Sequence, residues 1–180
     1  MEIESVLPAS TSAFIAFGIN DFKTFSNDYK TYLDKTGRYD SYNRAISEIN
    51  KSLNINLEEI FYSFLENEIA LVYTDINPTE INNNVYVVMN TKGKSLAEDQ
   101  LTMLLKNYGK KIKKGLSSFI THFEIDDETS HLIFKMPVNK IACKLFGSVF
   151  ANAETNYFTF IDNYLVFGKT ISSLSKFIQD

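Results

Sequence analysis

The residues with the clearest chemical potential are His122, Glu124 and His131, which include both histidines of the chain. A hairpin with its turn over residues 126–129 would place Glu124 opposite His131. Because side chains two positions apart in a strand share a face, all three side chains would then project from the same side. Two imidazoles and one carboxylate suit Zn or Fe(II), since neutral nitrogen donors and one anion leave coordination positions open. The residue types alone would therefore suit a site for one divalent metal ion.

The expected distances between these side chains support a metal site less well than their chemical types do. Metal donors converge to within about 2 to 2.3 Å of the ion, whereas diagonal neighbours on a flat ribbon start roughly 7 to 8 Å apart. A turn of about three or five residues would also split the set across both faces of the hairpin. We therefore favour a sheet face that carries a histidine and glutamate pair, and keep a metal-binding domain or metal-dependent enzyme as the alternative.

A second cluster of functional groups is a basic run around Tyr108. It could meet a phosphate or an acidic partner. A solvated helix end is the favoured interpretation, because cations stabilise a helix C-terminus and the run has no Arg for bidentate phosphate contacts. The run consists of Lys106, Lys110, Lys111, Lys113 and Lys114.

Other catalytic patterns are missing from the sequence. It contains no nucleophile elbow of the Gly-x-Ser-x-Gly type, and neither P-loop nor dinucleotide-binding spacing. The single cysteine, Cys143, lies among apolar residues, so we interpret it as a buried structural thiol. Apart from the metal alternative, the sequence predicts no enzymatic chemistry.

Composition indicates a folded chain and limits its partners. The 180 residues are 44% hydrophobic and 22% charged, which is enough to bury the core of a single α+β domain over residues 1–180. The net charge of −4 offers no general attraction to nucleic acid or anionic lipid, which need a surplus of Lys and Arg. No apolar run approaches the roughly 20 residues of a membrane span. Any membrane contact is therefore expected through a segment absent from this chain.

The elements that must position these residues follow a repeated order, in which two short apolar strands precede a helix. The third strand pair is apolar on nearly both faces, which indicates a central place in the sheet. The helix after it stops at Asp180 after about two turns, so we expect the chain to be an N-terminal excerpt of a longer one. The strand pairs are predicted at residues 68–75 and 85–91, 118–125 and 131–136, and 157–161 and 164–168.

The first third of the chain predicts a strand over residues 12–19 followed by three helices. The Asn20-Asp21 pair and Asn56 are expected to cap the first and third helices. Apolar stripes at helical spacing are interpreted as core. In the first two helices they are Phe22, Phe25, Tyr29, Tyr32 and Leu33, then Tyr42, Ala45, Ile46, Ile49 and Leu53. The predicted fold is α+β, with a largely antiparallel sheet of strand pairs and helices packed on one face.

Three stretches within the first 75 residues carry a resemblance. They read LPASTSAF at residues 7–14, LNINLEEI at 53–60 and FLENEIALV at 64–72. Together they resemble a domain-of-unknown-function family of membrane-anchored envelope proteins in Bacteroides-type bacteria, with Asn67 standing where that family often has Gly. The resemblance implies an envelope setting on the periplasmic face, an anchor in the full-length protein and truncation on both sides. It brings no catalytic residues.

The function that we expect is non-enzymatic: an extracytoplasmic binding or scaffold module of a bacterial envelope protein. Its exposed sheet face or aromatic surface would meet another protein or an envelope polymer, with tyrosines carrying much of the contact. The alternative is the metal site at His122, Glu124 and His131. A third interpretation is self-association, because repeated strand pairs leave sheet edges that must be covered or paired.

Overall fold

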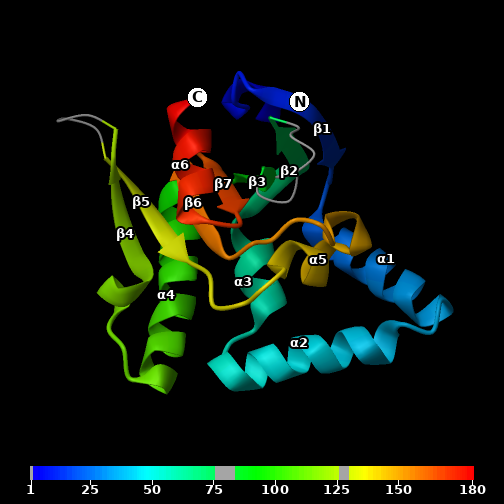
Figure 1. The fold of residues 1–180 in the computed structure, drawn as a ribbon. Helices are drawn as coiled ribbons and strands as arrows, with labels where there is room; N and C mark the ends of the chain where they lie inside the picture. The colour runs from blue at the N-terminus through cyan, green and yellow to red at the C-terminus, as the bar shows by residue number, and fades with distance from the viewer. Residues whose placement is uncertain (1, 76–83, 126–129) are drawn as a thin grey trace.

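Seven strands form one antiparallel sheet in the order β1-β2-β3-β7-β6-β5-β4 (Figure 1). The computed structural model describes residues 2–75, 84–125 and 130–180. The strands are β1 (Thr11–Gly18), β2 (Leu65–Thr74), β3 (Val85–Thr91), β4 (Ile120–Glu124), β5 (Ser130–Lys135), β6 (Tyr157–Ile161) and β7 (Tyr164–Gly168). The predicted α+β fold with an antiparallel sheet is confirmed.

The three predicted strand pairs are the hairpins β2–β3, β4–β5 and β6–β7. β7 also pairs with β3 and β6 with β5, so the third hairpin lies between the other two. Every residue of β3 and β7 is buried, as strands covered on both faces require. The central place predicted for the third hairpin is therefore confirmed, and the sheet edges are β1 and β4.

The helices begin and end close to the predicted signals. The side chain of Asp21 accepts a hydrogen bond from the Thr24 amide at 2.7 Å, and that of Asn56 accepts one from the Glu59 amide at 3.3 Å, which confirms both predicted caps. In the described ranges the α-helices are α1 (Phe22–Lys35), α2 (Tyr39–Leu53), α3 (Leu57–Phe64), α4 (Lys94–Ile112), α5 (Ile141–Phe146) and α6 (Ile171–Gln179). Short 3₁₀ helices are η1 (Ile3–Val6), η3 (Leu116–Phe119) and η4 (Ser148–Phe150).

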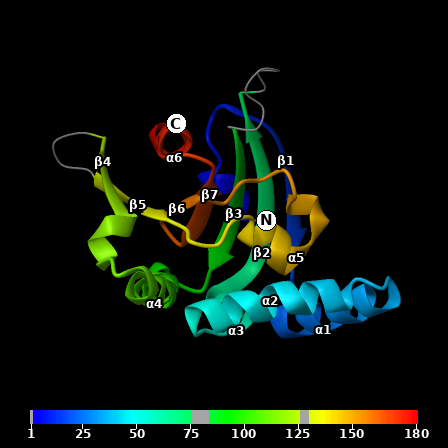
Figure 2. The same cartoon turned by 60° about the horizontal axis from the view of Figure 1, so that its bottom comes forward.

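The two faces of the sheet have different covers. Alternate strand residues such as Leu71 and Leu165 pack against α1 to α5, whereas their neighbours Val72 and Val166 pack against η1 and α6. Figure 2 shows α6 on the opposite side of β6 and β7 from α4. The prediction that the helices pack on one face is thus right for α1 to α5, and α6 is the exception.

Three helices lie in the chain between the first two strands of the sheet. α1, α2 and α3 all lie between β1 and β2 in the chain, yet these strands are hydrogen-bonded neighbours. The chain before β1 is tied to β2 by the buried Glu68 carboxylate, which accepts hydrogen bonds from the Glu2 amide at 3.1 Å and the Ile3 amide at 2.9 Å. The α1–α3 segment therefore leaves the sheet after β1 and returns to it at β2, between two paired strands.

Over the described ranges, no helix combines the length and the apolar character that a membrane span requires.

Candidate binding site

The hairpin that carries the predicted metal ligands has a different register from the one expected. Phe123 pairs with His131, and Glu124 pairs with Ser130. Directly opposed residues point to the same side of an antiparallel pair, so His122 and Glu124 lie on one face and His131 on the other. The prediction that these three side chains share a face is wrong by one residue of register. The turn expected at residues 126–129 lies outside the described residues.

No metal centre is apparent in the part of the chain that the structure describes. Within residues 2–75, 84–125 and 130–180, no three His, Cys, Asp or Glu side chains gather closely enough to hold an ion. Metal binding by His122, Glu124 and His131 stays a prediction, without support from the geometry of the hairpin.

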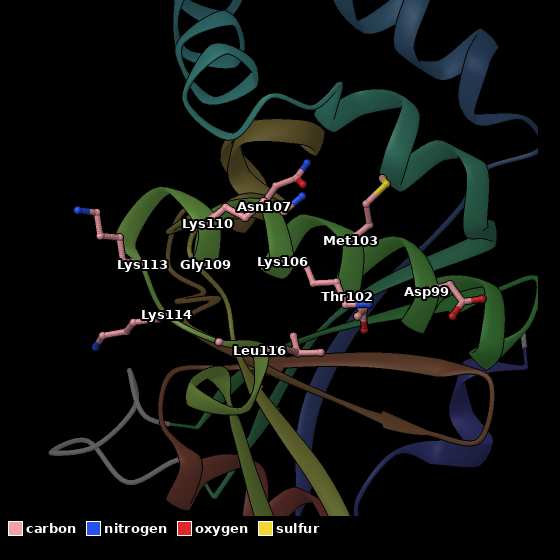
Figure 3. A pocket seen from close by; sticks show the side chains of 11 residues that line it. Asp99, Thr102, Met103, Lys106, Asn107, Gly109, Lys110, Lys113, Lys114 and Leu116 are labelled. Carbon is pink, nitrogen blue, oxygen red and sulfur yellow. The ribbon is translucent and has the colours of Figure 1, made fainter.

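Four lysines of the basic run, all except Lys111, line an open hollow of about 540 Å³ beside α4 (Figure 3). The side chains of Lys113 and Lys114 extend away from the hollow, and those of Lys106 and Lys110 do not converge with them on one point. An anion site needs donors that meet at the ligand. This arrangement suits a solvated helix end, where lysines favour the carbonyl-rich terminus.

A different surface gathers aromatic and apolar side chains around α2. One hollow of about 480 Å³ lies between α1, α2, α5 and η4, and a second of about 370 Å³ continues along α2 toward α4. They share Ala45 and Lys144 in their walls, and we call the two together the α2 groove. Its main lining side chains are Tyr29, Tyr32, Arg38, Tyr42, Ile46, Ile49, Leu53, Tyr108, Val138, Cys143, Phe146 and Val149.

Two tyrosines of the groove, Tyr29 and Tyr32, belong to a row of stacked rings along α1. Phe25 and Tyr29 stack with ring centroids 5.8 Å apart, and Tyr29 and Tyr32 stack at 6.4 Å. The row starts at Phe22, which is buried, and ends at Tyr32, which is 51% exposed. A stripe at helical spacing therefore leads from the core to the solvent, because α1 extends past the sheet that it covers (Figure 1).

Arg38 is held over the outer end of this row of rings. Its guanidinium carbon lies 5.2 Å from the centre of the Tyr32 ring, Nη2 donates to the Tyr32 hydroxyl at 2.6 Å, and Nε donates to Thr36 Oγ1 at 3.2 Å. The turn that brings it there passes through Gly37, whose φ of 68° favours glycine. Two of its five N–H donors are used by these bonds, so a positioned guanidinium still offers donors at the mouth of the groove.

A polar network fixes α1, α2 and α3 behind the groove. The half-buried Glu58 carboxylate accepts hydrogen bonds from the Tyr42 hydroxyl at 2.7 Å and from Lys30 Nζ at 3.0 Å. Burial, together with the bond to Glu58, raises the pKa of Tyr42 far above its ordinary value, so the phenol remains a donor. The neighbouring Tyr62 hydroxyl is buried without a hydrogen-bond partner among the described residues, and burial raises its pKa to about 12.

The opposite wall of the groove depends on a close approach at Gly147. This residue has a φ of 100°, and a Cβ built there would lie 3.2 Å from the Tyr29 hydroxyl oxygen. Cys143, one helical turn earlier, is only partly buried and lines the groove, although the sequence indicated a buried thiol. The absence of a side chain at Gly147 lets α5 and η4 approach α1 and complete the first hollow.

The sequence placed the groove residues of α1 and α2 on helical stripes, and we interpreted these stripes as core. Tyr29, Tyr32 and Tyr42 are the residues that the interpretation missed as a binding surface. In the sequence, these three positions differ from the other stripe positions only in carrying a phenol in place of an aliphatic or Phe side chain. A buried ring with a hydroxyl favours the boundary between core and solvent. The contribution of α5 was not predictable from spacing, because α5 lies far away in the chain.

Comparison with protein-family models, curated proteins and solved structures finds no match to this chain.

Proposed function

We propose that this chain is a non-enzymatic binding module and that the α2 groove holds a segment of its partner. The observation that supports this most directly is the composition of the groove. Tyrosines with accessible edges stand beside an aliphatic floor that includes Ile49 and Leu53, and α2 leaves this floor open along one side. Binding sites for proteins are commonly built from buried aliphatic pockets with aromatic side chains at the rim.

The groove is also preorganised. Its walls are held by the stacked rings of α1, by the bonds of Glu58 to Tyr42 and Lys30, and by Arg38 over Tyr32. A partner would therefore find the side chains already placed, which reduces the entropy that association costs. This rigidity supports a recognition surface more than a flexible packing defect.

The setting that we propose is the extracytoplasmic side of a bacterial envelope, with a protein or an envelope polymer as the partner. This part of the proposal is supported by the resemblance of residues 7–14, 53–60 and 64–72 to envelope proteins. Fractionation of the cells that make the protein tests it: recovery with the envelope is expected, and recovery with the cytoplasmic fraction contradicts it.

Site-specific photocrosslinking tests the groove itself. A photoreactive phenylalanine analogue at Val149, at the lip of the groove, should yield a crosslinked partner in the cells that make the protein. Met103 is a matched control, because its exposed fraction of 43% is close to the 44% of Val149, while it lines the basic hollow of α4 and not the groove. Crosslinks from position 149 and none from position 103 are expected. Equal yields from both positions, or none from position 149, would contradict the proposal.

A further inference from the structure

The α2 groove differs in charge from the chain as a whole. The chain carries a net charge of −4, yet the walls of the groove contain Arg38 and Lys144 against one carboxylate, Glu48. Lys111 adds a third cation at the far end, where its Nζ donates to the Ser52 side chain. The surface that lines the groove is therefore positive on an acidic protein.

These cations are not neutralised by carboxylates in the described ranges. Salt bridges there join Lys30 to Glu58 and Lys140 to Glu154. Lys144 Nζ donates to the carbonyl oxygen of Asn139 at 2.8 Å, and Arg38 donates to two hydroxyl oxygens. Hydrogen bonds to neutral acceptors position the cations and leave their charge unbalanced, which favours an anionic group on the ligand.

The shape of the groove limits the ligand further. It follows α2 from Ser41 to Leu53, about 18 Å at a rise of 1.5 Å per residue. That length accommodates about five or six residues of extended peptide or about three turns of helix. The floor of the second hollow is aliphatic, with Ile49, Leu53 and Val138. Sugar hydroxyls would lose water there without gaining hydrogen-bond partners, whereas methyl-bearing side chains would gain contact.

We propose that the ligand of the α2 groove is an acidic, amphipathic peptide segment, with apolar side chains in the two hollows and carboxylates at Arg38 and Lys144. The proposal rests on the binding function proposed above and names its ligand class. Arg38 is the stronger anchor, because its guanidinium is oriented by Tyr32 and can bind a carboxylate through two N–H groups.

Selection from a random dodecapeptide phage library on the immobilised full chain tests this proposal. Counter-selection uses the Ala45→Gln variant, because Ala45 belongs to both hollows and a longer uncharged side chain would fill them. Circular dichroism and thermal unfolding confirm that each variant is folded. Peptides that depend on the open groove are expected to combine apolar residues with an excess of Asp and Glu.

The charge dependence of the selected peptides is then measured by fluorescence anisotropy. Arg38→Gln with Lys144→Gln should weaken binding about tenfold or more, as expected when charged hydrogen bonds are lost. Lys113→Gln with Lys114→Gln removes the same charge outside the groove and should change the dissociation constant less than about twofold. An equal loss in both pairs would show only general attraction and would overturn the proposal.

The remaining outcomes separate this proposal from the binding function. Groove-dependent peptides without acidic residues would overturn the acidic ligand and leave the binding function in place. Peptides that bind Ala45→Gln as well as the parent chain, or no peptides at all, would overturn the peptide ligand. In that case alginate oligomers are the next probe: their binding to the parent and not to Ala45→Gln would assign the groove to an acidic polymer, and no binding would count against the groove as a site.

Discussion

The two faces of the sheet are covered by layers of unequal depth. α1 to α5 form a deep layer, whose buried core includes Phe61, Phe64 and Phe158, while η1 and α6 form a shallow one. The α2 groove lies among helices of the deep layer. The comparison teaches that hollows such as the α2 groove form where helices pack on one another as well as on the sheet. The shallow layer mainly shields strands.

The largest expected effect comes from the core of the deep layer. Phe61→Ala removes a fully buried ring that lies 5.3 Å from Phe64 and 6.5 Å from Phe167, centroid to centroid. The free energy of unfolding should fall by about 3 to 5 kcal/mol, through lost burial and the cavity that remains. Urea unfolding measures it. The control Ile15→Ala, on the exposed edge strand, should change stability by less than about 0.5 kcal/mol. Similar losses of unfolding free energy in the two variants would contradict the view that Phe61 lies deeper in the core than Ile15.

The polar network behind the groove should give the next largest effect. Tyr42→Phe deprives the half-buried Glu58 carboxylate of its 2.7 Å donor and should cost about 1 to 2 kcal/mol. The loss is expected to appear together with weaker ligand binding, because α1 and α2 lose their link through Glu58. Chemical unfolding and binding measured on the same sample test both parts. An unchanged stability would mean that water replaces the phenol without cost.

The shallow layer should respond locally. Tyr86 donates a hydrogen bond from its hydroxyl to the Ser173 carbonyl oxygen at 2.9 Å, and its ring lies 4.8 Å from that of Phe177. Tyr86→Phe should cost about 1 kcal/mol. Hydrogen exchange should show the loss as faster exchange of the α6 amides, with α4 amides as the internal reference. A uniform change over both helices would mean that α6 does not open independently of the deep layer.

The smallest effect at neutral pH is expected at Tyr62. Its hydroxyl is buried without a partner among the described residues, so Tyr62→Phe should change stability by less than about 0.5 kcal/mol there. At high pH the two proteins should diverge. The pKa of Tyr62 is raised from 10.0 to about 12 in the folded state, so the unfolded chain loses this proton first. The stability of the parent chain should therefore fall as the pH rises from 10 toward 12.

Urea midpoints between pH 8 and 11.5 measure this divergence, and absorbance at 295 nm follows the phenolate. The decline should be less steep in Tyr62→Phe. Burial raises the pKa of Tyr29 and Tyr42 as well, so part of the decline should persist in the variant. Parallel curves for the two proteins would show that Tyr62 titrates alike in the folded and unfolded chains.

The sequence predicted the sheet better than the site, for physical reasons. Alternating apolar residues report burial directly, so the strand pairs and the central place of Phe158 and Phe167 could be predicted. The register around His131 could not, because a shift of one residue there exchanges faces and the turn residues favour no single length. The face of the sheet on which α6 packs depends on the direction in which the chain leaves β7. The spacing of apolar residues does not report that direction.

The groove was not predicted because its parts are separated in the chain. The stripe that includes Tyr29 and Tyr32 is amphipathic, and a sequence pattern cannot tell a ring at the edge of the core from one inside it. Arg38 reaches its position only through the turn at Gly37. The lack of a side chain at Gly147 matters only because this residue lies against Tyr29 of α1. The sequence shows the chemical type of each residue, but tertiary contacts determine which of these residues lie together.

The chain leaves the sheet after β1, forms α1 to α3 and returns to the sheet at β2. β1 and β2 pair across three helices, and the entropy of closing such a loop rises only slowly with its length, by about 0.6 kcal/mol per doubling. Residues between Gly18 and Leu65 can therefore lengthen, shorten or change their outer surface while the strand register stays intact. The binding surface that we propose can therefore change in sequence and length without a change in the sheet.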